Sequence, residues 1–108
     1  AERFGVGVAP WGTAMPGATV VNATPLGMRG EPLPAGILEE AAGLVDLAYG
    51  QQPTPAIRSA RSRGLPAIDG ITVLVAQAAE SFEIWTCLPA PRAVMEQAAL
   101  RPETLKTP

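Results

Sequence analysis

The sequence of 108 residues contains no histidine, and Cys87 is its only cysteine. Ser-His-Asp and Cys-His catalysis depend on an imidazole base, so neither mechanism is possible within this chain. One thiol without histidine provides too few ligands for a zinc site, and we therefore predict no metal site. A single unpaired thiol is also typical of proteins in a reducing compartment, which favours a cytoplasmic location.

Strong net charge and long apolar runs are also missing. The formal net charge is −2, which is too weak to attract nucleic acid or a membrane surface, so we expect neither as a partner. No apolar run approaches the roughly 20 residues that a transmembrane helix needs. The first residues contain no apolar signal-peptide segment and look like the last turn of a helix that ends at Gly5.

Hydrophobic residues make up 47% of the chain, and 12 prolines and 11 glycines predict many turns. This composition is sufficient for the core of one small domain. Apolar runs that alternate with helical patterns predict a parallel sheet with right-handed crossovers. The expected strands are 5–10, 18–21, 44–49 and 65–68, and the expected helices are 36–42, 54–63, 69–85 and 92–100.

The residues that follow the second expected strand are the first candidates for a site. The apolar run Ala18–Val21 stops at Asn22, and a Pro-x-Gly turn follows at 25–27. In open parallel sheets, ligands bind outside the carboxyl ends of the strands, so this loop is well placed to contact one. A second interpretation is that the Asn22 side chain simply braces the turn.

The stretch Asn22–Met28, Asn-Ala-Thr-Pro-Leu-Gly-Met, resembles the strand and loop of shikimate dehydrogenases. The likeness continues in Asp46–Tyr49, Thr54-Pro55, Asp69-Gly70 and Leu74–Trp85, in the order and at the spacing of the family. The resemblance implies an α/β fold, a three-layer Rossmann-like parallel sheet that is the C-terminal portion of a dinucleotide-binding domain. Residues 1–108 would then be a single partial domain, the second half of a Rossmann-like NADP-binding domain plus C-terminal helices.

The resemblance also implies an activity, the NADP-dependent, reversible reduction of 3-dehydroshikimate to shikimate in aromatic amino-acid biosynthesis. The family's N-terminal catalytic domain and its glycine-rich phosphate loop have no counterpart in these 108 residues. We therefore expect the C-terminal part of such an enzyme, inactive alone, with the missing N-terminal catalytic domain as its partner. The lysine and aspartate that handle the proton in the family belong to that domain, so no catalytic residue is assigned here.

Two groups of residues would contact ligands if the resemblance holds. The cofactor would be NADP, and the substrate would be shikimate or 3-dehydroshikimate. Val73 departs from the family, in which a methionine is usual beside the nicotinamide; valine keeps an apolar wall but is shorter and stiffer. The residues implied to bind the cofactor are Asn22, Ala23, Thr24, Leu47, Gly70 and Val73, and those implied to bind the substrate are Tyr49 and Gln77.

Several of these residues also have a purely structural interpretation. Gly70 fits a tight turn, Tyr49 a half-buried packing residue, and Gln77 a boundary residue half in water. Asp46 interrupts an apolar strand, and we expect its carboxylate to accept backbone N–H bonds rather than to act in catalysis.

The helices of the second half carry two further patterns. Arg58, Arg61 and Arg63 lie in the C-terminal half of their expected helix, where cations suit the helix dipole; a site for the 2′-phosphate of NADP is the alternative. Gln77 lies on a partly apolar stripe of its helix, and the resemblance implies that it points to the side of Tyr49. The apolar face expected at 100° steps is Ile71, Leu74, Ala78, Phe82 and Trp85.

Two classes of function therefore remain open for this sequence. One is the cofactor half of a shikimate dehydrogenase, or of a relative that uses quinate. The other is a non-catalytic α/β module that binds or assembles with a partner, which the absence of catalytic groups favours.

Overall fold

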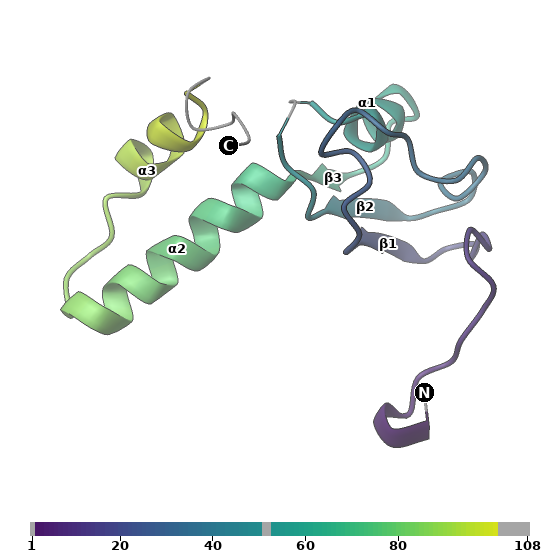
Figure 1. Cartoon of the computed structure of the whole chain (residues 1–108), viewed down its shortest axis with the longest axis horizontal. Helices are drawn as coiled ribbons and strands as arrows, with labels where there is room; N and C mark the ends of the chain where they lie inside the picture. The colour runs from purple at the N-terminus through teal and green to yellow at the C-terminus, as the bar shows by residue number, and fades with distance from the viewer. Residues whose placement is uncertain (1, 51–52, 102–108) are drawn as a thin grey trace.

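The computed structural model describes residues 2–50 and 53–101 and shows a small α/β arrangement (Figure 1). Its three strands are all parallel and lie in the order β1-β2-β3. The α/β class with a parallel sheet is confirmed. The elements are a 3-10 helix at Glu2–Phe4, β1 (Thr19–Asn22), β2 (Gly43–Asp46), α1 (Pro55–Ser62), β3 (Ala67–Ile68), α2 (Gly70–Thr86) and α3 (Arg92–Ala99).

Helix α1 begins where the sequence predicts it. The Thr54 hydroxyl caps the helix by accepting a hydrogen bond from the Ile57 N–H at 3.3 Å, and Pro55 occupies the first turn. Gly64 follows the helix with a φ of +70°, which suits a glycine. The apolar side of α1 covers one face of the sheet, and the buried core there consists of Leu38, Ala41, Leu44, Ala56, Ile57 and Ala60.

The opposite face of the sheet is largely exposed in the described part of the chain. Val21 pairs with Val45, which pairs with Ile68, so the three side chains project from the same face. Val21 is 56% exposed and Ile68 is 48% exposed. Of the three expected layers, the described residues therefore form the sheet and the helical layer on the α1 side.

Helices α2 and α3 form a hairpin that extends away from the sheet (Figure 1). Asp69 caps α2, as expected, by accepting a hydrogen bond from the Thr72 N–H at 2.8 Å. The hairpin buries Ile71, Val75 and Ala99 between its helices. None of the helices in the described ranges is long and apolar enough to cross a membrane.

The predicted apolar face of α2 is correct at its start and wrong at its end. Ile71 is buried, but Trp85 is 81% exposed. Apart from Gly70 at its start, the buried residues of the helix are Ile71, Val75 and Ala79, which follow a spacing of four. Helix α3 is short and packs over the first turns of α2, so the apolar residues near the distal end have nothing to pack against in the described chain.

Two predicted elements do not form. Residues 5–10 are not a strand, because they are exposed and pair with no described segment. Residues 36–42 form successive single turns instead of a helix, with Ile37 N bonded to Pro34 O and Glu39 N bonded to Gly36 O. Gly36 has a φ of +83°, which lies outside the right-handed helical region and opposes a continuous helix from this residue.

Candidate functional site

The strands β1 and β2 end in a pair of buried polar side chains. Asn22 and Asp46 are register partners, and they are 3% and 0% exposed. Asn22 Nδ2 donates a hydrogen bond to Asp46 Oδ1 at 2.8 Å. Because side chains alternate along a strand, both lie on the face that also carries Leu44, toward α1.

The Asp46 carboxylate accepts two further hydrogen bonds. The Ala48 N–H donates to Oδ1 at 3.1 Å, and the Thr54 hydroxyl donates to Oδ2 at 2.5 Å. The prediction that Asp46 accepts hydrogen bonds from backbone N–H groups is thus right for one donor, Ala48. The other two hydrogen bonds come from the side chains of Asn22 and Thr54. Sequence reasoning recognises Thr54 as a helix cap but misses its bond to Asp46.

The Asn22 side chain braces the loop that follows β1. Its Oδ1 accepts from the Thr24 N–H at 3.0 Å and from the Thr24 hydroxyl at 2.6 Å, while Nδ2 also donates to Leu26 O at 2.9 Å. All four hydrogen-bonding positions of the amide are therefore used within the chain. The bracing interpretation of Asn22 is confirmed, and Ala23 remains as an exposed residue of this loop.

A hollow of about 140 Å³ lies at the carboxyl edge of β2, beside the start of α2. Five of the eight predicted contact residues meet there, although they come from two segments of the chain. Gln77 lies with Tyr49 and Gly70, as predicted. The hollow is lined by Leu47, Tyr49, Gly70, Val73, Leu74 and Gln77.

Leu74 is the lining residue that sequence reasoning assigns to the core instead. A signal for it is present, since residues 70, 73, 74 and 77 follow the spacing of one helical stripe. The loop residues Asn22, Ala23 and Thr24 do not line this hollow. They lie at the end of the neighbouring strand, and backbone pairing joins the two regions through the bond from Leu47 N to Asn22 O at 3.0 Å.

Gly70 is required by close contact between backbones. A Cβ atom at this position would collide with Ala48 O and would lie 2.8 Å from Leu47 O, too close for any side chain. The first residue of α2 therefore packs directly on the chain that leaves β2. This contact, rather than a tight turn, is the structural role of Gly70, and it brings Val73 and Gln77 beside Tyr49.

The hollow is electrically neutral and of mixed polarity. Leu47, Val73 and Leu74 give it apolar walls, and no acidic or basic side chain among the described residues lines it. The Tyr49 phenol and the Gln77 amide can both donate and accept hydrogen bonds. Such a site suits a flat or ring-shaped ligand with uncharged polar substituents better than it suits an anion.

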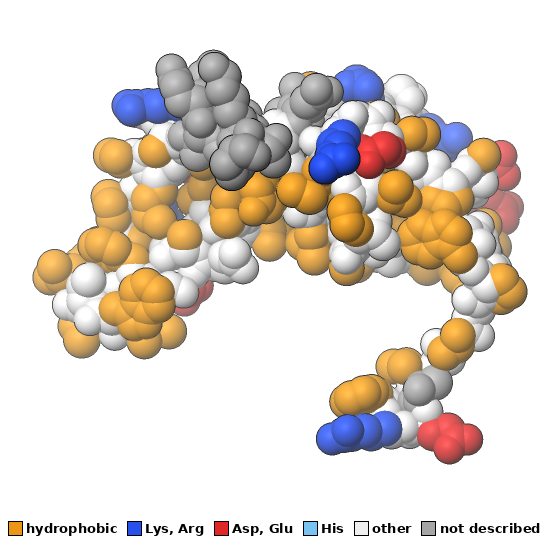
Figure 2. Space-filling model, viewed as in Figure 1, with side chains coloured by type: hydrophobic (Ala, Val, Ile, Leu, Met, Phe, Trp, Pro, Cys, Tyr) orange, Lys and Arg blue, Asp and Glu red, His pale blue; other side chains and the backbone are white. Residues whose placement is uncertain are grey.

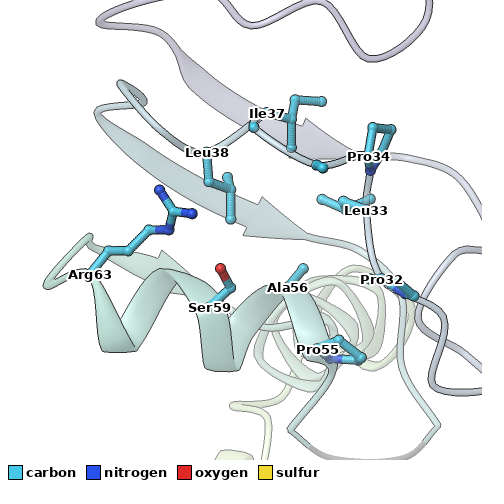
Figure 3. Close-up of a pocket in the computed structure, with 11 residues that line it drawn as sticks. Pro32, Leu33, Pro34, Ile37, Leu38, Pro55, Ala56, Ser59 and Arg63 are labelled. Atoms are coloured by element: carbon cyan, nitrogen blue, oxygen red, sulfur yellow. The ribbon is translucent and has the colours of Figure 1, made fainter.

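The arginines of α1 lie elsewhere. Arg58 Nη1 donates to Pro53 O at 2.8 Å, and the guanidinium of Arg61 lies 3.9 Å from the Asp69 carboxylate. Arg63 borders a separate hollow of about 120 Å³ between α1 and the proline-rich segment 32–38, where its side chain lies near Leu38 and Ser59 (Figure 3). None of the predicted contact residues lines that second hollow.

Charged groups near the first loop are engaged with the backbone. Glu31 Oε1 accepts from the Arg29 N–H at 2.8 Å. Hydrogen bonds from its own N–H and from that of Arg29 hold the pKa of the exposed Glu31 carboxyl below its usual value. Within residues 2–50 and 53–101, no group of three His, Cys, Asp or Glu side chains could hold a metal ion.

The parallel strand order and the hollow at the carboxyl edge of the sheet are typical of Rossmann-like domains. Residues 70–100 match the family model described as the shikimate 5'-dehydrogenase C-terminal domain. Over most of its length the chain is similar, in sequence and in fold, to the C-terminal portion of shikimate dehydrogenases, which confirms the resemblance.

Individual relatives show the extent of this similarity. The chain is 46% identical over 86 residues to the shikimate dehydrogenase (NADP(+)) of Archaeoglobus fulgidus, covering 76% of this chain and 32% of the relative. It is 48% identical over 87 residues to the shikimate dehydrogenase (NADP(+)) of Alkalilimnicola ehrlichii, covering 78% of this chain and 32% of that relative. The shikimate 5-dehydrogenase of Thermus thermophilus, solved with NADP(H) and shikimate, is 37% identical with a TM-score of 0.65, covering 75% and 32%. The chain thus spans about a third of the length of these relatives.

Proposed function

We propose that this chain is the cofactor half of an NADP-dependent shikimate dehydrogenase, an oxidoreductase that reversibly reduces 3-dehydroshikimate to shikimate. Residues 1–108 would form the second half of its Rossmann-like NADP-binding domain together with the C-terminal helices. The observation that carries the proposal is the hollow at the edge of β2, because two segments bring five of the implied contact residues together there.

The residues of the hollow fit the nicotinamide end of NADP. Leu47 and Val73 provide apolar contacts for a ring, and Gly70 lets the start of α2 pack against the backbone that leaves β2, which brings these two walls together. The Ala23 side of the braced loop would border the cofactor, with Asn22 and Thr24 holding that loop in shape. The bound cofactor supplies the hydride, and the residues of this chain orient it and exclude water.

Tyr49 and Gln77 fit the substrate. A ring with several hydroxyl groups needs partners that both donate and accept, which a phenol and an amide provide. No charged side chain of the described chain lines the hollow, so the carboxylate of shikimate must be bound from outside it. The proton-transfer residues are likewise assigned to the N-terminal catalytic domain, the proposed partner of this chain, in a cytoplasmic enzyme.

The substitution Gln77→Ala in the dehydrogenase tests this assignment. Loss of one hydrogen bond is worth about 0.5–1.5 kcal/mol, so KM for shikimate should rise about twofold to tenfold while KM for NADP barely changes. Gln97→Ala is the matched control, because Gln97 is an exposed glutamine on α3 that does not line the hollow. Unchanged shikimate kinetics in the Gln77 variant would show that this residue does not bind the substrate.

The exposed sheet face supports a second candidate, a non-catalytic module that binds a partner through Val21 and Ile68. Steady-state assays with shikimate and with quinate distinguish the possibilities. Turnover of shikimate with NADP supports the dehydrogenase, and preferred turnover of quinate supports the related enzyme. Absence of turnover of either compound, in protein that includes both domains, would favour the module.

A further inference from the structure

The buried carboxylate of Asp46 takes no part in the proposed chemistry, yet it is bonded to three separate segments around the site. It accepts from the Asn22 amide at the end of β1, from the Ala48 N–H beyond β2, and from the Thr54 hydroxyl at the start of α1. Each bond joins a neutral donor to a carboxylate in the interior, where such bonds are strong. No ion pair within the described residues involves Asp46, so these three donors hold it in place.

Ala48 links the carboxylate to the helix that carries Val73 and Gln77. The Ala48 N–H donates to Asp46 Oδ1 at 3.1 Å, while its carbonyl oxygen lies so close to Gly70 that a Cβ there would collide with it. The peptide units around Ala48 thus contact Asp46 on one side and the first residue of α2 on the other. A shift of Ala48 would move the start of α2 relative to Leu47 and Tyr49.

Asn22 links the carboxylate to the loop proposed to border the cofactor. Its Nδ2 joins Asp46 Oδ1 to Leu26 O, and its Oδ1 holds both the N–H and the hydroxyl of Thr24. Because the amide is bonded at all four positions, its orientation is fixed by Asp46 and the loop together. The same carboxylate therefore contacts, directly or through one residue, both parts of the proposed site.

We propose that Asp46 is a positioning residue: it holds the loop after β1, the exit of β2 and the start of α2 in the relative positions that the hollow requires. The inference rests on the proposed function, because it explains how the residues assigned to NADP and shikimate are aligned. Asp46 touches neither ligand in this account, and it acts through Asn22, Ala48 and Thr54.

The substitution Asp46→Asn in the two-domain dehydrogenase tests this role with little change in side-chain volume. The amide oxygen can keep the donors at Asn22 and Ala48, but the amide nitrogen then faces the Thr54 hydroxyl, whose proton loses its acceptor. We expect KM for shikimate and KM for NADP both to rise by about tenfold to hundredfold, since a misplacement near 1 Å can cost that much. The matched control is Ile57→Val, which loosens the buried contact between α1 and the sheet and leaves the carboxylate intact.

A second pair of variants applies if Asp46→Asn fails to fold. Thr54→Val removes one donor, and Thr54→Ser keeps both the cap and the bond to Asp46. The valine variant should raise both KM values, and the serine variant should restore them to within about twofold. If Asp46 and Thr54 only stabilised the fold, the KM values would change in step with the free energy of unfolding. Thr54→Val and Ile57→Val would then have equal KM values when they are equally destabilised, and that result would overturn the proposal.

Hydrogen exchange without ligands separates this inference from the proposed function. In Asp46→Asn, the Ala48 and Thr24 amides should exchange at least about tenfold faster than in wild type, whereas amides in the middle of α2 should not change. Unchanged exchange at Ala48 and Thr24 would overturn the positioning role whatever the enzyme does. Wild-type protein that turns over neither shikimate nor quinate would overturn the proposed function. The exchange rates at Ala48 and Thr24 would still decide whether Asp46 positions these segments.

Discussion

The sheet with α1 and the hairpin of α2 and α3 differ in how they are stabilised. The sheet and α1 share a core of six buried apolar residues, with five more packed against it. The hairpin buries three, and its distal end exposes Ile84, Trp85 and Leu88, where Figure 2 shows hydrophobic side chains gathered on the surface. The hairpin is therefore the less stable region. The start of α2 is held against the end of β2 by the backbone contact at Gly70.

Truncation of one large apolar side chain in each region should show this difference most clearly. Leu44→Ala removes a side chain that is buried between the sheet and α1, and we expect a loss of about 2–5 kcal/mol in the free energy of unfolding. Trp85→Ala should change it by less than about 0.5 kcal/mol, because the indole is exposed in this chain. Urea unfolding of both variants measures the two values. A larger loss for Trp85→Ala would reverse the comparison.

The substitution Gly70→Ala tests the backbone contact between the start of α2 and the end of β2. The added methyl group would collide with Ala48 O, and overpacking of this kind costs about 1–3 kcal/mol. Gly7→Ala is the control, because a Cβ at Gly7 meets nothing within 4 Å. Thermal unfolding followed by circular dichroism compares them, and equal melting temperatures would mean that the contact at Gly70 is unimportant.

Substitution of Cys87 by glycine should change the stability by less, and should raise it rather than lower it. It ends α2 with a φ of 56°, a conformation that costs a residue with a side chain about 1–2 kcal/mol. Cys87→Gly should therefore stabilise the hairpin by about 0.5–1 kcal/mol, after the entropy cost of glycine is included. Cys87→Ala keeps the strained backbone and should show no gain, so equal stability of the two variants would contradict this explanation.

Arg92 should give the smallest effect. Its guanidinium lies 3.1 Å from Glu80 and 3.0 Å from Glu83, and these carboxylates raise its pKa above the usual value. The raised pKa means that the stabilisation is present at neutral pH and is lost as the pH rises through that raised pKa. The pair is exposed, so Arg92→Gln should lower stability slightly at low salt and not at all at about 1 M salt. A loss that persists at high salt would show a contribution from packing.

The caps are the most predictable features of the fold. Thr54 and Asp69 are both followed by helices because their side chains satisfy a free N–H three residues on, and that signal is local. The strand expected at 5–10 depends instead on a partner strand, which the described chain does not supply. The expected apolar face of α2 is wrong near Trp85 for a similar reason, since the position of α3 decides which stripe is buried.

The candidate site is partly predictable for the same physical reason. Gly70 and Gln77 are placed correctly beside Tyr49, because a helical spacing and a resemblance both point there. The bond between Asp46 and Thr54 is not predictable in this way. It joins residues on either side of a turn, and sequence spacing alone carries no information on how that turn closes.

The most direct test of the account is a crystal structure of the proposed two-domain dehydrogenase with NADP and shikimate. The account predicts the nicotinamide against Leu47, Gly70 and Val73, with shikimate bonded to Tyr49 and Gln77, and Asp46 touching neither ligand. Binding of either ligand away from this hollow, for example beside Arg63 in the hollow of Figure 3, would contradict it.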